Sequence, residues 1–362
     1  MGKKKGYNIG EQFMAGLSYM SGTLLLLCAF SPLISPQYFS YVTLLGLAFP
    51  LALAGTFFLF LLTLLFTPKK AWICGIALLL SLPAIRRYFP INLSSPPPKN
   101  ALHVLSFNTL GYGVFGQYSF PDGHVNQIGK YLKEKNADIV CLQEANISGK
   151  YYRKYVQPQM AQYRHHSSTN FDKSTLAVFS KYPIVREEMI CQNVGNGAMA
   201  YWIELQPQDT LLVVNTHLLS YSFSQKEKEN INSSVAHPKS SSSRHTLFNI
   251  MHKVAKVSGR RAEMVDSIAS FLERHKNESM IVCGDFNDTP ISYAYNQLSK
   301  NLKDAYVRTG NGLGRSYREG SFVVRIDHLF CSKDWRPYAC TVDNSIDKSD
   351  HYPIEAFFKR IK

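Results

Sequence analysis

The chain opens with two long apolar segments, Phe13–Phe30 and Tyr41–Phe66, and no charged residue occurs between Glu11 and Lys69. As a helix, each segment is long enough to cross about 30 Å of hydrocarbon. The sequence Ser31–Gln37, with two prolines, predicts a turn between them. A cleaved signal peptide is the alternative for the first segment, but a second apolar segment directly after it argues against that. The pattern therefore predicts a helical hairpin that spans a membrane.

A third apolar segment, Ala71–Ile85, has 15 residues. This is short for a span unless the helix continues past Arg86 and Arg87, whose long side chains can reach the headgroups. We therefore expect residues 1–93 to be a membrane anchor with two to three transmembrane helices. The proline-rich sequence SSPPPK then predicts an extended linker over residues 94–101.

The basic residues near these segments predict an orientation. Lys3–Lys5 precede the first segment, and Lys69 and Lys70 follow the second. The positive-inside rule places both clusters in the cytoplasm, so three spans would carry the rest of the chain to the other side. Arg86 and Arg87 follow the third segment and favour the opposite orientation. On balance we expect an integral membrane protein whose C-terminal part is extracytoplasmic.

From Leu102 onward, short apolar runs alternate with amphipathic helices, which predicts an α/β domain over residues 102–362. Such a chain, with many strands and few helices, is typical of two packed sheets flanked by helices. Residues 220–243 are polar, have no apolar period and predict a long mobile surface insertion. Strands are expected at 102–109, 138–143, 176–180, 201–205, 211–218, 281–283, 322–330 and 349–358, and helices at 125–132 and 260–275.

Composition adds little to this picture. A net charge of +14 is compatible with an anionic substrate or with membrane headgroups but identifies neither. The seven cysteines show no CxxC and no Cys/His zinc spacing. We therefore expect buried free thiols rather than disulfides or a zinc site.

Candidate chemistry begins with the stretch IVCGDFNDTP at residues 281–290. Asp285 and Asn287 are two apart, so on a pleated strand end both would project to the same side. Taken alone, the stretch could equally be an Asp-rich turn after a strand, because Asp and Asn are common turn residues. Chance gives one or two such positions in an α/β domain, however, whereas here eight residues suited to metal and phosphate chemistry end or directly follow apolar strand-like runs. They are Asn108, Glu144, His217, Asp285, Asn287, Asp327, Asp350 and His351.

The segments SFNTLG, IVCLQEA, NTHL, CGDFND, RIDHLF and SDHYPI occur in this order. Together they resemble the endonuclease/exonuclease/phosphatase superfamily of deoxyribonuclease I-like proteins, here as a membrane-anchored member of bacterial type. The resemblance covers about residues 102–362. It implies a four-layer α/β sandwich of two mostly antiparallel sheets flanked by helices, with the site across the top of the sheets. It also implies divalent-metal-dependent cleavage of a phosphoester.

On this reading, three residues serve the metal. Glu144 is the main ligand of Mg²⁺ or Mn²⁺, hard ions that prefer oxygen and keep several waters. Asn108 orients the metal or the phosphate, and Asp350 supports the metal or positions water. The non-functional alternatives are a surface Glu for Glu144, a turn Asn for Asn108 and a solvated loop Asp for Asp350.

The remaining five residues are candidates for catalysis. His351 would polarise the attacking water or contact the phosphate, with Asp327 accepting its other N–H. The rival assignment makes Asp285 the general base, with Asn287 holding it and the phosphate. The sequence does not separate these two assignments. His217 would bind a phosphate oxygen or assist the leaving group.

Nearby residues are expected to be structural. His328 stands where an aromatic residue is expected in many relatives, so packing is favoured. Arg260 and Arg261 open the helix before the central strand, and exposed helix charges are favoured over a phosphate contact.

The substrate class stays open at this point. A metal-dependent phosphodiesterase or nuclease ranks first, and a lipid phosphodiesterase or phosphatase of the sphingomyelinase or inositol-phosphatase kind ranks second. The expected partners are thus a nucleic acid or phospholipid headgroup and the membrane, and no protein partner is predicted. We see no obvious aromatic loop that would enter a bilayer, and no dense basic and aromatic stretch for strand stacking. An inactive binding module is the third possibility, which the intact set of eight residues disfavours.

Overall fold

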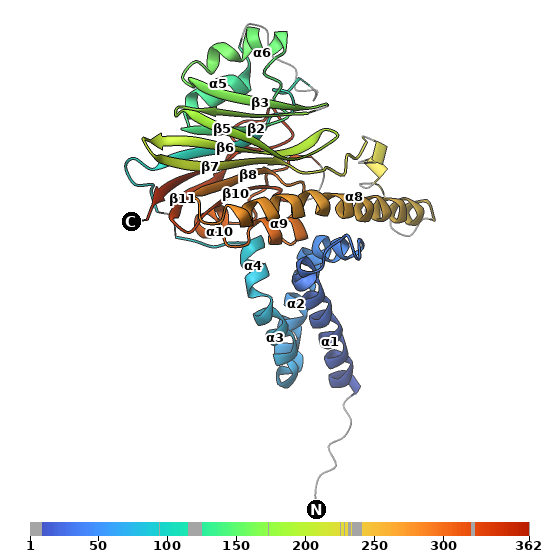
Figure 1. Ribbon diagram of the computed structural model, residues 1–362. Helices are drawn as coiled ribbons and strands as arrows, with labels where there is room; N and C mark the ends of the chain where they lie inside the picture. The colour runs from blue at the N-terminus through green and yellow to red at the C-terminus, as the bar shows by residue number, and fades with distance from the viewer. Residues whose placement is uncertain are drawn as a thin grey trace, which may run out of the picture.

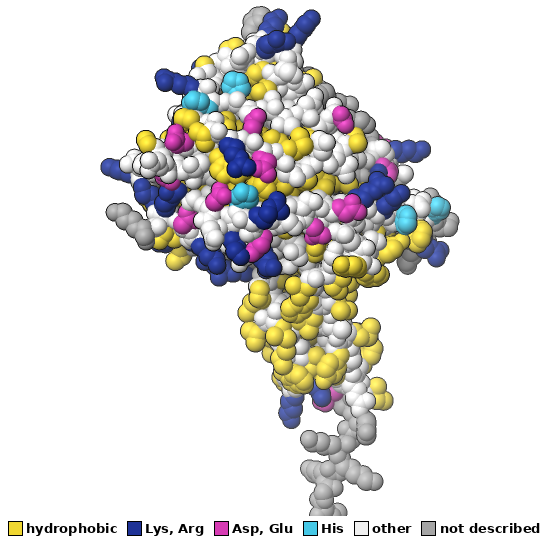
Figure 2. Space-filling model, in the orientation of Figure 1, with side chains coloured by type: hydrophobic (Ala, Val, Ile, Leu, Met, Phe, Trp, Pro, Cys, Tyr) yellow, Lys and Arg dark blue, Asp and Glu magenta, His cyan; other side chains and the backbone are white. Residues whose placement is uncertain are grey.

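The computed structural model describes residues 9–93, 95–114, 125–172, 174–224, 226–227, 229–230, 233, 241–319 and 323–361. The N-terminal helices form a stalk that projects from an α/β body (Figure 1). We use "stalk" for residues 9–88 and "body" for residues 102–361. The stalk is coated with hydrophobic side chains, whereas the charged side chains gather on the body (Figure 2).

The stalk consists of the helices α1 (Ile9–Phe30), α2 (Val42–Phe66), α3 (Trp72–Leu80) and α4 (Leu82–Tyr88), with the short helices η1 (Ser31–Leu33) and η2 (Pro68–Lys70) between them. α1 and α2 are long and apolar enough to cross a membrane. The third apolar segment is not one straight helix, because α3 and α4 meet at a bend of 57°. Pro83 lies in the first turn of α4, where a residue without an N–H is tolerated. In the interior of one continuous helix the same proline would remove a backbone hydrogen bond, so the helix is broken there. The bent pair makes a third span only if it is counted as one.

The body contains two six-stranded sheets. The first has the order β11-β12-β1-β2-β4-β3, and the second has the order β5-β6-β7-β8-β10-β9. In each, one parallel pair (β1–β2 or β7–β8) stands among antiparallel neighbours. The strands of the first sheet are β1 (Leu102–Asn108), β2 (Ile139–Gln143), β3 (His165–Phe171), β4 (Ser174–Ser180), β11 (Trp335–Val342) and β12 (Ile354–Arg360). Those of the second are β5 (Ile184–Asn193), β6 (Asn196–Gln206), β7 (Asp209–His217), β8 (Met280–Asp285), β9 (Lys303–Asp304) and β10 (Asp327–Cys331).

The two sheets pack face to face and enclose a core that includes Val104, Cys141, Val213 and Cys283. The helices α5 (Gln127–Lys135) and α6 (Lys150–Tyr155), with η3 (Gln157–Gln159), lie over the outer face of the first sheet. The helices α8 (Ser241–Arg274) and α9 (Tyr293–Leu298) cover the second, and α10 (Ala305–Thr309) lies beside β11. This confirms the predicted four-layer sandwich of helices, sheet, sheet and helices (Figure 1).

Several elements differ from their predicted bounds. The four edge strands, β3, β5, β9 and β11, were not predicted. The side chains of β3 and β5 are mostly exposed or half-buried, so these strands lack an apolar run. β10 begins at Asp327 rather than at residue 322. α8 begins at Ser241, inside the segment predicted to be a mobile insertion. Much of residues 225–240 lies outside the described residues. All seven cysteines are free, as predicted.

The stalk and the body are packed against each other and not merely joined by a linker. Ile291, which follows β8, is 2% exposed and packs among stalk residues such as Phe49. Gly46 of α2 makes this approach possible, since a Cβ there would lie 2.2 Å from the Ile291 carbonyl oxygen. Arg325 Nη2 also donates to the Arg87 carbonyl at 2.8 Å. The body is thus seated on one end of the helical stalk.

Candidate functional site

The candidate residues meet where the two parallel strand pairs end. Asn108 ends β1 and Glu144 follows β2 in the first sheet, while His217 and Asp285 end β7 and β8 in the second. The carboxyl ends of parallel strands share one edge of a sheet, which is where ligand sites of such sheets form. The side-chain amide of Asn108 donates to Glu144 Oε1 at 3.1 Å and to Asp285 Oδ2 at 3.0 Å. One amide therefore links the two sheets.

Asp285 lies at the centre of this group and is 1% exposed. Its Oδ2 is 3.7 Å from His217 Nε2 and 3.6 Å from His351 Nε2, and its Oδ1 accepts from the Asn287 backbone N–H at 2.8 Å. Burial raises the pKa of Asp285, and the neighbouring His351, His217 and Asn108 only partly oppose this. This carboxylate is thus surrounded by nitrogen atoms on several sides.

His351 is fixed by Asp327. Its Nδ1 lies 2.8 Å from Asp327 Oδ2, and both side chains are buried. Burial alone would lower the pKa of His351, but the charges of Asp327 and Asp285 outweigh it and raise that pKa well above its ordinary value. The raised pKa favours the protonated form of this imidazole. The backbone N–H of Asp327 donates in turn to the Ser316 hydroxyl at 3.1 Å, which holds the start of β10.

The pKa of His217 is shifted in the opposite direction to that of His351. Its Nε2 lies 3.7 Å from Glu144 Oε1, and its Nδ1 lies 3.3 Å from the Ser174 hydroxyl. Burial lowers the pKa of His217, although the Asp285 charge partly opposes it. This imidazole is therefore neutral at neutral pH. Two histidines within 4 Å of the same carboxylate oxygen thus have pKa values shifted in opposite directions, an arrangement that suits acid–base chemistry.

The other predicted residues lie around this centre. Glu144 has a positive φ of 53° at the strand end, and 27% of its side chain is exposed. Asp350 is half-buried, and its pKa is raised by burial and by the charges of Glu144 and Asp285, although His351 opposes this. Ser349 ties this segment to the site, because its hydroxyl donates to the Asn108 carbonyl at 2.7 Å.

Asn287 differs from its predicted geometry. β8 ends at Asp285 and Asn287 has a φ of 51°, so the strand pleat does not extend to it. Its side-chain amide donates to the Leu218 carbonyl at 2.9 Å, beyond the end of β7. Asn287 supports Asp285 through its backbone N–H rather than by projecting beside it from a pleated strand.

The donor set fits a hard divalent cation. Four carboxylates, those of Glu144, Asp285, Asp327 and Asp350, gather at one edge of the sandwich, and oxygen ligands are what Mg²⁺ and Mn²⁺ prefer. The nearest ligand atoms of Asp285, Asp327 and His351 lie within 4.8 Å of one another. Among the described residues, Asp327 Oδ1 is buried and has no hydrogen-bond partner. An ion would relieve this excess of negative charge.

Arg261 corrects one sequence interpretation. It is not an exposed helix charge but is 1% exposed, with Nη1 2.8 Å from Asp288 Oδ2. Its Nε donates to the Leu219 carbonyl at 2.7 Å, so one guanidinium holds the loops that follow β7 and β8. A signal was present, since residue 261 falls on the same helical stripe as the buried Val265 and Ile268. The neighbouring Arg260 is exposed.

The sequence analysis missed the supporting serines Ser174, Ser316 and Ser349. Single serines near strand ends follow no pattern, so nothing in the sequence separates them from ordinary loop serines. His328 has the packing environment that was predicted, because it lies among the rings of Phe286 and Phe330.

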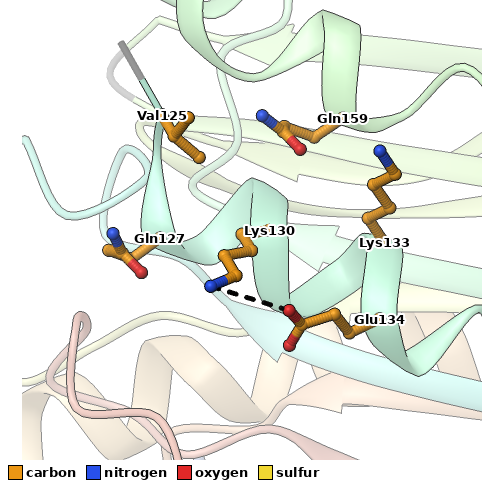
Figure 3. Close-up of a pocket in the computed structure, with 6 residues that line it drawn as sticks. All are labelled: Val125, Gln127, Lys130, Lys133, Glu134 and Gln159. Atoms are coloured by element: carbon orange, nitrogen blue, oxygen red, sulfur yellow. Dashed lines mark ion pairs between the residues drawn. The ribbon is translucent and has the colours of Figure 1, made fainter. Parts of the chain in front are cut away.

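A separate open groove of about 660 Å³ lies over α5 (Figure 3). Lys130 and Glu134, 3.8 Å apart, form an exposed ion pair in it. None of the eight candidate residues lines it. The groove therefore does not belong to the site at the strand ends, and its lining consists of Val125, Gln127, Lys130, Lys133, Glu134 and Gln159.

Comparison with known proteins adds a family assignment. A model of the Endonuclease/Exonuclease/phosphatase family matches residues 105–351, and a model of a domain of unknown function (DUF8431) matches residues 11–88. No curated protein sequence matches the chain.

Three solved structures are similar at low identity. A functionally unknown conserved protein from Enterococcus faecalis V583 is 14% identical, with 72% of this chain and 100% of that chain covered and a TM-score of 0.49. The human nocturnin catalytic domain with bound sulfate anion is 14% identical, with 74% and 97% covered and a TM-score of 0.49. A mannosyl-6-phosphatase from Bacteroides thetaiotaomicron VPI-5482 is 16% identical, with 72% and 100% covered and a TM-score of 0.47.

Proposed function

This chain belongs to the endonuclease/exonuclease/phosphatase family, and from that premise we propose that it is a membrane-anchored, divalent-metal-dependent hydrolase of phosphodiesters, nuclease-like in its chemistry. One observation carries the proposal. The Asn108 amide bonds to both Glu144 and Asp285, so a candidate metal ligand and a candidate base are held together across the two sheets. Hydrolysis of a phosphodiester needs charge neutralisation and an activated water side by side.

We assign the metal to Glu144, Asn108 and Asp350. The Glu144 side chain is 27% exposed, and the pKa of Asp350 is raised chiefly by burial and further by the charges of Glu144 and Asp285. The alternative group that includes Asp327 and His351 is less suited, because His351 Nδ1 already hydrogen-bonds Asp327. When bound, Mg²⁺ or Mn²⁺ supplies charge neutralisation at the phosphate and a more acidic water.

The pKa directions favour one of the two catalytic assignments. The raised pKa of His351 favours its protonated form, which would donate from Nε2 to a phosphate oxygen while Asp327 accepts the Nδ1–H. Asp285 is then the group that accepts the proton of the attacking water, oriented by the Asn287 backbone N–H. His217, whose Nε2 lies 3.7 Å from Asp285 Oδ2, contacts a phosphate oxygen or the leaving group.

The stalk supports membrane anchoring with the body outside the cytoplasm. α2 starts beside the body and ends at the far end of the stalk, so Lys69 and Lys70 lie away from the body (Figure 1). Arg87, which argued for the opposite orientation, is engaged by the body, since it bonds Asn296 at 3.3 Å and stacks on Tyr295. Its weight as a topology signal is therefore small.

A phospholipid headgroup is the second candidate substrate. The specific observation in its favour is Ile291, which lies on the segment after Asp285 and packs among the stalk helices. The loop that supports the proposed base is thus adjacent to the predicted bilayer. A lipid phosphodiesterase or phosphatase would exploit this closeness.

The test is turnover by the full-length protein in detergent and in lipid nanodiscs, with and without Mg²⁺ or Mn²⁺. The panel contains plasmid DNA, an abasic oligonucleotide, sphingomyelin, phosphatidylinositol phosphates and a chromogenic phosphodiester. Metal-dependent turnover is expected, and His351→Ala should lower kcat by about 10²–10⁴-fold with folding intact. Cleavage of DNA alone selects the nuclease, and turnover of lipid alone selects the second candidate. No turnover of any substrate would support the inactive binding module.

A further inference from the structure

The helix α8 lies across the end of the stalk that faces the body (Figure 1). Two contacts fix it there. The Ser258 hydroxyl bonds Thr43 at the start of α2 at 3.2 Å, and His252 Nδ1 lies 3.0 Å from the Tyr41 hydroxyl. α8 is therefore held at the point where α2 begins, which is where the proposed bilayer ends.

One stripe of α8 faces the stalk. His252, Gly259 and Asp266 are spaced seven residues apart, which is two helical turns. Each approaches the segment between α1 and α2, with Gly259 beside the Pro36 carbonyl and Asp266 bonded to Gln37. Toward the N-terminus this stripe continues past the stalk. The first turns of α8 therefore overhang on the side that faces the proposed bilayer (Figure 1).

Large apolar side chains are exposed where the stripe overhangs. Phe248, one turn before His252, is 64% exposed, and Met251 is also exposed. The segment before α2 adds further exposed rings, so that hydrophobic side chains continue from the top of the stalk toward α8 (Figure 2). We call this set the interfacial patch, and its members are Tyr38, Phe39, Tyr41, Phe248 and Met251.

The same part of α8 is purely basic. No acidic residue occurs from Ser241 to Ala262. Arg244, Lys256 and Arg260 are exposed there, while Lys253 pairs with Glu227 at 2.9 Å. Aromatic rings at the ends of membrane spans, combined with a basic amphipathic helix, match the chemistry of an anionic lipid surface.

We infer that the interfacial patch and the basic N-terminal half of α8 form a lipid-binding surface that lies in the headgroup region of an anionic bilayer. The inference rests on the proposed membrane insertion of the stalk, because α8 meets lipid only if the stalk is inserted. A bilayer is favoured over a protein partner because the patch is continuous with the two apolar helices that are long enough to span. Since α8 also carries Arg261, its lipid contact would fix the height of the catalytic site above the membrane.

Brominated lipids test this surface directly, since bromine on the acyl chains quenches tryptophan that lies in the bilayer. The full-length chain is reconstituted into nanodiscs of brominated phosphatidylcholine, with or without phosphatidylglycerol. Trp72 on α3 is 55% exposed on the stalk and reports stalk insertion in the parent chain. In a Trp72→Phe background, Phe248→Trp reports the patch, and Val194→Trp, at an exposed turn between β5 and β6, is the matched control.

We expect brominated lipid to reduce the fluorescence of Phe248→Trp but not that of Val194→Trp. The loss should be larger with phosphatidylglycerol, and replacing Arg244 and Lys256 by Gln should remove this increment, whereas the exposed Lys276→Gln should not. If Trp72 is quenched while Phe248→Trp is not, the stalk is inserted but the lipid-binding surface is refuted. If Trp72 is not quenched either, the proposed anchoring itself fails. Protection of Phe248→Trp that grows with protein concentration would show that a second copy covers the patch, which also overturns the inference.

Discussion

Arg261 on α8 and Asp288 after β8 form a buried ion pair, with 2.8 Å between Nη1 and Oδ2. Burial raises the pKa of Asp288, and Arg261 is the main opposing influence. The pair connects the helix that lies over the stalk with the loop that follows Asp285. Its removal should therefore affect folding before it affects any single catalytic group.

We expect Arg261→Met to destabilise the protein by roughly 3–5 kcal/mol, because it leaves the Asp288 carboxylate buried without a partner. Chemical denaturation in one detergent measures this. Arg260→Met is the matched control, since its side chain is exposed, and should change little. Adding Asp288→Leu to Arg261→Met should recover part of the loss. A single substitution that costs no more than the control would contradict the structural role of the pair.

Glu144→Gln should weaken the dependence of turnover on metal, because a neutral amide replaces the carboxylate proposed as the main metal ligand. The measurement is a Mn²⁺ titration of activity, in which the half-saturating concentration should rise at least about tenfold, as 1.4 kcal/mol of lost binding energy would produce. Glu134→Gln, on the exposed groove of Figure 3, is the matched control. An unchanged titration would remove Glu144 from its proposed role.

The fit between stalk and body should be sensitive to one methyl group. A Cβ at Gly46 would meet the Ile291 carbonyl oxygen, which is backbone and cannot rotate away, so Gly46→Ala should cost about 1–3 kcal/mol. Gly55→Ala is the same substitution in the same helix with nothing within 4 Å, and should be neutral or slightly stabilising. Thermal unfolding of both variants in one detergent compares them. Equal melting temperatures would mean that α2 does not pack on the body in this way.

Acid should weaken the body at the edge where β12 meets α5. Lys135 bonds both Asp343 and Glu355. Burial raises both carboxyl pKa values, but hydrogen bonds outweigh it, chiefly from Lys135 and Ser345 at Asp343 and from His103 and Lys135 at Glu355. The pKa of Asp343 falls to about 2, and that of Glu355 also falls below its ordinary value.

These lowered pKa values mean that the folded chain binds protons less tightly than the unfolded chain at both groups. Their stabilisation is therefore complete above the ordinary value of 4.5 for Glu and is lost as the pH falls toward about 2. Lys135→Met should flatten this part of a plot of unfolding free energy against pH, while the exposed Lys133→Met on the same helix should leave it unchanged. An identical slope in both variants would show that Lys135 is not the cause.

The sequence predicted the fold class and most of the central strands because these are buried on both faces and read as apolar runs. Asn108, Glu144, His217 and Asp285 end or follow such strands, whereas Asp327 begins β10 and Asp350 and His351 precede β12. The structure gathers them all at one edge. The edge strands β3 and β5 escaped because their side chains are mostly exposed or half-buried.

What the sequence did not predict depends on contacts between distant segments. Arg261 looks like any helix charge until Asp288 is brought beside it. Ser349 acquires a role only when its hydroxyl reaches the Asn108 carbonyl. The docking of Ile291 among the stalk helices likewise has no local signature, because a proline-rich linker predicts separation rather than contact. Tertiary geometry, not composition, decides each of these cases.

The pairing of β1 with β12 joins the two ends of the body. The first strand of the body is hydrogen-bonded to the last, with Leu102 opposite Phe358, and the segment with Ser349 and His351 lies just before that last strand. During synthesis the stalk and β1 emerge long before β12 exists, and contacts between such distant segments form late in folding. The nascent chain therefore lacks His351 until nearly the whole protein has been made. On the proposed function, a chain that terminates before this segment would hold the stalk and most of the body but an incomplete site.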